Sequence, residues 1–278
     1  MLGSAIIVFR EALEAALIIG IIAAATRGLQ ARNFWLLSGI GAGVVGSLIV
    51  ASLTGQIAQL AEGTGQELFN AGILGLAAMM LAWHNIWMAR HGMQLAKDAR
   101  QLGQDVTSGN REMSALAAVV ALAILREGSE TALFLYGLLT GGEETLATVL
   151  GGGAIGLLVG SLAGYGLYAG FVRIPVRLFF AATSGLILLL AAAMTSQAAR
   201  FLVQADILPS LATPLWDTSW LLDNGSLLGR FLHTLVGYEA MPSGIQVVFY
   251  SATLILILAG MRILRVQSPP STANLKGI

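Results

Sequence analysis

Long apolar stretches alternate with short polar segments along most of the chain. A helix needs about 20 apolar residues to cross the hydrocarbon core of a bilayer. Seven stretches reach that length, at 2–26, 34–54, 68–89, 113–140, 146–171, 178–199 and 245–264. The segment 201–244 interrupts the pattern with prolines, tryptophans and aspartates, which predicts a long loop with room for an interfacial helix. The fold class we predict is an all-α integral membrane protein with seven transmembrane helices.

Composition agrees with that fold class and excludes several others. The 278 residues are 56% hydrophobic and only 11% charged, whereas a typical soluble domain carries roughly 25% charge. Lys plus Arg equals Asp plus Glu at 15 each, without a basic patch, so we expect no nucleic-acid partner. The absence of cysteine excludes disulfides, zinc–thiolate sites and thiol nucleophiles. The chain has neither a G-x-x-x-x-G-K-[ST] nor an H-E-x-x-H motif. These two absences exclude ATP hydrolysis through a P-loop and the commonest zinc-protease chemistry. Together with the motifs described below, our prediction is a membrane transporter without a permanently bound cofactor, and not an enzyme.

The basic residues predict the orientation in the membrane. Eleven of them follow spans one, three, five and seven, whereas the opposite side carries only Arg200 and Arg230. Under the positive-inside rule, the N-terminus is extracytoplasmic and the C-terminus is cytoplasmic. We expect a multi-pass protein of the cytoplasmic (inner) membrane.

The two halves of the chain repeat one pattern. The motif R-E-x-x-E occurs at 10–14 and again at 126–130, 116 residues later. In each half the next span carries small residues four apart, which let helices approach closely; these are Gly39, Gly43, Ser47 and Ala51, then Gly152, Gly156, Gly160 and Gly164. Spans one and four cross in opposite directions, which predicts an inverted 3+3 repeat plus one additional helix.

The repeat divides the chain into four parts. Residues 1–112 form the first three-helix repeat with a cytoplasmic loop, and residues 113–200 form the second repeat. Residues 201–244 form an extracytoplasmic loop, and residues 245–278 form the seventh helix and a cytoplasmic tail.

Each motif places an arginine and two glutamates inside a span. Glu11 and Glu14 lie about 60° apart on one helix face, and Arg10 can pair with Glu14 at i, i+4. The second motif repeats this geometry. Six unpaired charges would cost on the order of 15–20 kcal/mol. Two Arg–Glu pairs would offset much of that, but four acids and two bases leave a surplus of two negative charges. This surplus requires a cation or protons.

The ligand chemistry narrows the choice of cation. Carboxylate oxygens are hard ligands, and no Cys, His or Met lies next to either motif, which disfavours copper(I) and thiolate-type zinc sites. Fe(III), Mn(II), Mg(II), Ca(II) and protons all remain compatible. His84 and Asn85 lie between Trp83 and Trp87 near the inner end of span three. We interpret them as hydrogen-bonded neighbours of interfacial tryptophans, with a functional role as the alternative.

The doubled motif resembles the oxidase-dependent iron transporter family of ferric iron permeases, especially its bacterial members. The motifs read REALE at 10–14 and REGSE at 126–130, and residues 66–69 and 237–243 are also similar to that family. The resemblance covers nearly the whole chain. It implies import of iron, as Fe(III), with Arg10 and Arg126 as supporting charges and four glutamates carrying the ion, Glu11, Glu14, Glu127 and Glu130. It also implies an extracytoplasmic oxidase or iron-binding partner.

Acidic residues gather in the segments predicted to lie outside. Those that could relay a cation to the site are Glu67, Glu143, Glu144 and Glu239, although they could equally be solvated loop residues. Three alternatives to iron import remain open. They are a permease for another metal cation (divalent or lead), a proton-relay membrane subunit, and an intramembrane hydrolase that uses paired carboxylates.

Overall fold

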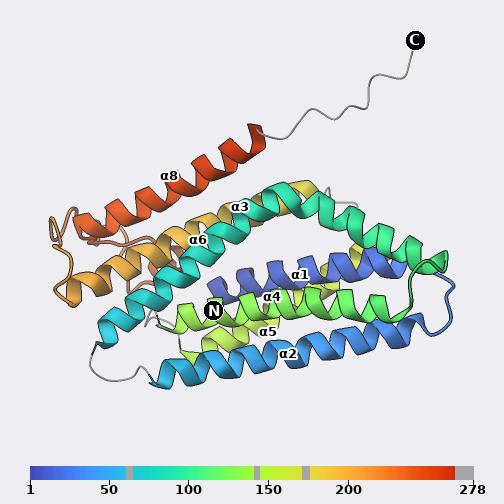
Figure 1. Cartoon of the computed structure of the whole chain (residues 1–278). Helices are drawn as coiled ribbons and strands as arrows, with labels where there is room; N and C mark the ends of the chain where they lie inside the picture. The colour runs from blue at the N-terminus through green and yellow to red at the C-terminus, as the bar shows by residue number, and fades with distance from the viewer. Residues whose placement is uncertain (61–64, 141–144, 171–175, 267–278) are drawn as a thin grey trace, which may run out of the picture.

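The computed structural model describes residues 1–60, 65–140, 145–170 and 176–266, and every regular element within them is a helix (Figure 1). There are eight helices in these residues: α1 (Leu2–Ala25), α2 (Arg32–Leu60), α3 (Gln66–Thr107), α4 (Ser114–Thr140), α5 (Leu146–Tyr168), α6 (Val176–Gln204), α7 (Leu227–Val236) and α8 (Gly244–Val266). The predicted all-α class is confirmed.

Five segments of these helices are long and apolar enough to cross a membrane: Arg32–Thr54, Gln66–Met88, Leu146–Tyr168, Ala182–Gln204 and Gly244–Ile263. The protein is therefore a multi-pass membrane protein. Helices α1 and α4 are also long enough, at 24 and 27 residues, but each contains the three charges of an R-E-x-x-E motif. Whether they complete a set of seven spans stays a prediction.

Helix α3 extends well past the span predicted from the sequence. Instead of ending near residue 89 and entering a loop, it continues to Thr107 and bends partway along its length (Figure 1). The extension is helical because it has its own buried face. Ala99, Leu102 and Val106, spaced three and four apart, pack with Ile22 of α1 and Leu36 of α2.

The helices pack in pairs that bring the two motif helices together. Helix α1 packs most extensively on α5, α2 on α4, and α3 on α6, while α8 lies against α6. Helices α1 and α4 also contact each other, and both contact α3. In Figure 1, α1, α2, α4 and α5 form one group of adjacent helices, and α3, α6 and α8 lie together beside it. The two motifs therefore face each other and the middle of α3.

Glycines set the closest approaches in two of these pairs. A Cβ atom on Gly43 would lie 2.8 Å from the Ala121 carbonyl oxygen of α4, and one on Gly156 would overlap the Ala5 carbonyl oxygen of α1. The two alanines are equivalent under the predicted repeat, because they differ by 116 residues, the offset of the motifs, whereas the two glycines differ by 113. The small-residue faces thus pack as predicted, whereas the inverted repeat itself stays a prediction.

The segment after α6 is held by backbone hydrogen bonds between its own residues. The Thr218 amide donates to the Ala240 carbonyl at 2.9 Å, and the Leu215 amide donates to the Pro242 carbonyl at 2.8 Å. Helix α7 begins after Ser226, whose hydroxyl caps it by accepting from the Gly229 amide. The predicted loop does contain a helix. That this helix lies at the membrane interface stays a prediction.

Candidate metal centre

The candidate site lies one helical turn beyond an apolar core to which α1, α3, α4, α6 and α8 contribute. Ile7 of α1, Leu81 of α3 and Phe134 of α4 are completely buried in one cluster. Glu11 follows Ile7 by four residues, His84 follows Leu81 by three, and Glu130 precedes Phe134 by four. Residues at these spacings share a helix face. The faces that bury the core therefore also direct these polar groups inward.

The first motif is almost completely enclosed. The side chains of Arg10 and Glu11 are each 1% exposed. Arg10 Nε lies 3.0 Å from Glu14 Oε1, and its Nη1 lies 3.2 Å from Glu11 Oε1. The predicted i, i+4 pair is present, and the same guanidinium also contacts the second carboxylate.

The second motif makes the same pairs in more open surroundings. Arg126 Nε lies 3.2 Å from Glu130 Oε1 and 3.7 Å from Glu127 Oε1, but the Arg126 side chain is 34% exposed. Its guanidinium carbon lies 4.3 Å from the centre of the Trp87 ring of α3, a cation–π arrangement. Trp87 is therefore a contact of the motif arginine, a role that the sequence did not indicate.

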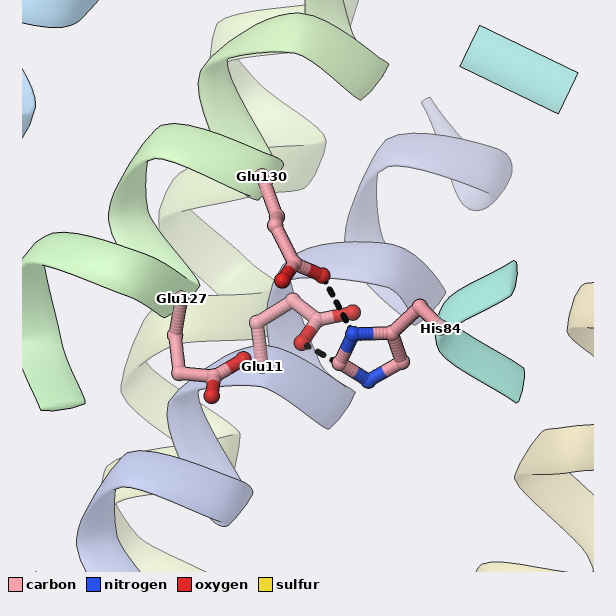
Figure 2. A group of neighbouring side chains, drawn as sticks. All are labelled: Glu11, His84, Glu127 and Glu130. Atoms are coloured by element: carbon pink, nitrogen blue, oxygen red, sulfur yellow. Dashed lines mark ion pairs between the residues drawn. The ribbon is translucent and has the colours of Figure 1, made fainter. Parts of the chain in front are cut away.

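His84 joins the two motifs, so our interfacial interpretation of this residue was wrong. It is 2% exposed and points from α3 toward both motif helices (Figure 2). Its Nδ1 contacts Glu130 Oε2, while its Nε2 lies 3.5 Å from Glu14 Oε2 and 3.9 Å from Glu11 Oε2. The sequence held one signal, since a titratable side chain inside an apolar span is costly and usually functional.

Four side chains are close enough to hold one metal ion: Glu11, His84, Glu127 and Glu130, called the ligand group below (Figure 2). Each offers one ligand atom, and these atoms lie within 4.8 Å of one another. Glu14, which we predicted to be a ligand, is outside this group and pairs with Arg10 and His84. Glu11 Oε2 and Glu127 Oε2 are buried with no hydrogen-bond donor among the described residues. A buried acceptor without a donor destabilises the folded protein unless a cation or a proton binds to it.

The two predicted outer acids that the structure describes lie away from this group. Glu67 is exposed on the first turn of α3. Glu239 accepts a hydrogen bond from Asn224 and lies 3.6 Å from His233 Nδ1, within the segment that precedes α8. Neither belongs to the ligand group, and Glu143 and Glu144 lie outside the described residues.

Comparison with known proteins gives consistent matches over the length of the chain. The "Iron permease FTR1 family" matches residues 1–267. A "Ferrous iron permease EfeU" of Yersinia pestis is 31% identical over 276 residues, covering 97% of this chain and 94% of the relative. A protein of the same name in Escherichia coli O6:K15:H31 is 30% identical over 258 residues, covering 90% and 91%. No solved structure matches the chain.

Proposed function

The chain belongs to the iron permease FTR1 family, and from this membership we propose that it imports iron through the glutamates of its two R-E-x-x-E motifs. As a member of that family it is a membrane transporter and not an enzyme. The proposed membrane is the cytoplasmic membrane, with the N-terminus outside and the C-terminus inside. The transported iron is the substrate, and no other cofactor is part of the proposal.

One observation carries the proposal: four buried or mostly buried carboxylates from two helices converge with only two guanidinium groups beside them. The sequence predicts a surplus of two negative charges, and the closeness of Glu11, Glu127 and Glu130 supports a single site for that surplus. Moving unpaired carboxylates out of water costs several kcal/mol each. A bound cation supplies the missing positive charge, which is what an iron site within the membrane requires.

The packing supports transport by relative movement of two repeats. Secondary transporters with inverted repeats bind substrate at the repeat interface and expose it alternately to the two sides. Here α1 and α4 supply the equivalent motifs, and the α1–α5 and α2–α4 pairs both approach closely at glycines. In the proposed cycle, Glu67 and the other outer acids gather the ion, and the glutamates replace part of its water shell. An extracytoplasmic iron-binding or oxidase protein would deliver the ion.

The oxidation state of the iron has two candidates, each with its own support. The oxygen-rich set of ligands favours Fe(III), the hard ion implied by the sequence resemblance. The relatives are named ferrous iron permeases, and a net charge of −2 from four glutamates and two arginines is neutralised by a divalent ion. Fe(II) is therefore the second candidate.

The test is radioactive iron uptake in cells that lack other iron importers. Wild type and Glu127→Gln are compared with iron supplied either as Fe(II) kept reduced by ascorbate or as Fe(III) citrate. We expect the wild type to take up one form of iron in preference to the other. We expect Glu127→Gln to take up neither form above background. Background uptake of both forms by wild type, at verified membrane abundance, would refute iron import.

A further inference from the structure

We propose that His84 is a ligand of the transported metal ion, and that its nitrogen makes the permease select transition-metal ions over Mg²⁺ and Ca²⁺. The proposal rests on the proposed function and extends it from a site of four carboxylates to a mixed site. The third ligand-bearing helix is α3, which carries neither R-E-x-x-E motif.

The position of the imidazole supports direct ligation. His84 is 2% exposed, and neither ring nitrogen has a hydrogen bond of normal geometry among the described residues. Both nitrogens instead face carboxylate oxygens, with Glu130 on the Nδ1 side and Glu14 and Glu11 on the Nε2 side. A histidine that served packing alone would use its nitrogens in ordinary hydrogen bonds. His84 is the fourth member of the ligand group, in the place where we predicted Glu14.

Glu14 then acquires a definite role. A metal-binding histidine usually donates its second ring N–H to a carboxylate, which fixes the orientation of the ring. Glu14 Oε2 is the carboxylate oxygen nearest to Nε2, at 3.5 Å compared with 3.9 Å for Glu11. We assign Nε2–H as the donor to Glu14 and Nδ1, on the Glu130 side, as the metal ligand. Arg10, at 3.0 Å from Glu14, keeps that carboxylate in place.

The selectivity follows from ligand preference. Mg²⁺ and Ca²⁺ are bound almost entirely through oxygen, whereas imidazole suits iron, zinc, copper and nickel. Mg²⁺ and Ca²⁺ are far more abundant than iron. Both ions would bind to a site made only of carboxylates. Replacing one oxygen with an imidazole nitrogen lowers the relative affinity for Mg²⁺ and Ca²⁺ while keeping the affinity for iron.

His84→Asn tests this inference, because it keeps a polar side chain of similar size close to the backbone. The matched control is His91→Asn on the same helix, where the ring stacks on Trp87 and contacts the Trp87 carbonyl at 3.1 Å. Iron uptake is measured with ascorbate-reduced iron, alone and with excess Mg²⁺ or Ca²⁺. We expect His84→Asn to raise the apparent KM for iron about tenfold or more and to become sensitive to Mg²⁺ and Ca²⁺, while His91→Asn stays like wild type.

A spectroscopic measurement provides a second readout. The purified full-length protein, loaded anaerobically with Fe(II), is studied by X-ray absorption, in which an imidazole ligand gives outer-shell multiple scattering. We expect this signature in wild type and His91→Asn and its loss in His84→Asn. Iron-loaded wild type without the signature would overturn the proposal, even if His84→Asn does not fold.

The two proposals can fail separately. If His84→Asn keeps wild-type affinity and selectivity while Glu127→Gln is inactive, His84 is not a ligand and iron import through the glutamates stands. If Glu127→Gln transports like wild type, the glutamate site itself is wrong, and the assignment of His84 is overturned with it.

Discussion

The two motif arginines have different surroundings, although their motifs share the same charged positions. Arg10 is 1% exposed and uses separate nitrogens for Glu11 and Glu14, whereas Arg126 is 34% exposed and rests on Trp87. A lysine has one nitrogen and cannot reproduce the guanidinium fork. The same substitution therefore has different consequences in the two motifs.

We expect Arg10→Lys to reduce iron uptake roughly 10- to 100-fold, because a buried charge-assisted hydrogen bond contributes about 1.5–3 kcal/mol. Arg126→Lys should cost at most about fivefold, since partly exposed pairs contribute about 0.2–1 kcal/mol. The measurement is uptake at equal membrane abundance of both variants. Equal losses in the two variants would show that the difference in burial has no functional effect.

At this scale the sequence predicted the charged residues and the i, i+4 pairs within each motif, but not the partners that α3 supplies. The glutamates and arginines were identifiable because charges inside a span are costly and the motif occurs twice. His84 and Trp87 come from α3, and their contacts with α4 depend on how two distant helices pack. The periodicity of one helix does not show how that helix packs on another. The contact between Glu14 and His84 was therefore not predicted either.

At the scale of elements, the close helix pairs depend on single glycines. A side chain on Gly156 would overlap the backbone of α1 at Ala5 and Phe9. Gly151, five residues earlier on α5, has open space where its Cβ would be. These two glycines provide a matched comparison within one helix.

Gly156→Val should destabilise the protein by about 1–3 kcal/mol, the usual cost of forcing atoms into a packed interface. Gly151→Val should have little effect. Denaturation of the purified proteins in detergent measures the difference, and iron uptake should fall with Gly156→Val because α1 carries a motif. Equal stability of the two variants would mean that the α1–α5 pair is not as close as described.

The limits of prediction also differ between elements. Apolar runs predicted the helices within a few residues at α1, α4, α5 and α8, because burial and hydropathy agree there. Beyond residue 89, α3 becomes polar on one side and the hydropathy signal is lost. Its helix persists because Leu102 and Val106 have a partner surface on α1 and α2, which sequence alone does not show.

For the whole molecule, the orientation in the membrane is the open prediction. The native chain has no cysteine, so a single introduced thiol reports on one position. Asn110, between α3 and α4, and Leu221, before α7, are both exposed. With an impermeant maleimide, Leu221→Cys should be labelled in spheroplasts and Asn110→Cys only after permeabilisation. The reverse pattern would invert the topology and the assignment of the outer acids.

The central claim is that iron crosses the membrane at the enclosed site formed by both motifs. The most direct measurement is iron entry into proteoliposomes that contain only the purified protein and a trapped iron-sensitive dye. Wild type is compared with Glu11→Gln and Glu127→Gln, one from each motif helix, and with the exposed Glu67→Gln as control. We predict iron entry with wild type, reduced at most modestly by Glu67→Gln, and no entry with either motif variant. Iron entry at the wild-type rate with Glu11→Gln and Glu127→Gln, at equal protein incorporation, would contradict the account.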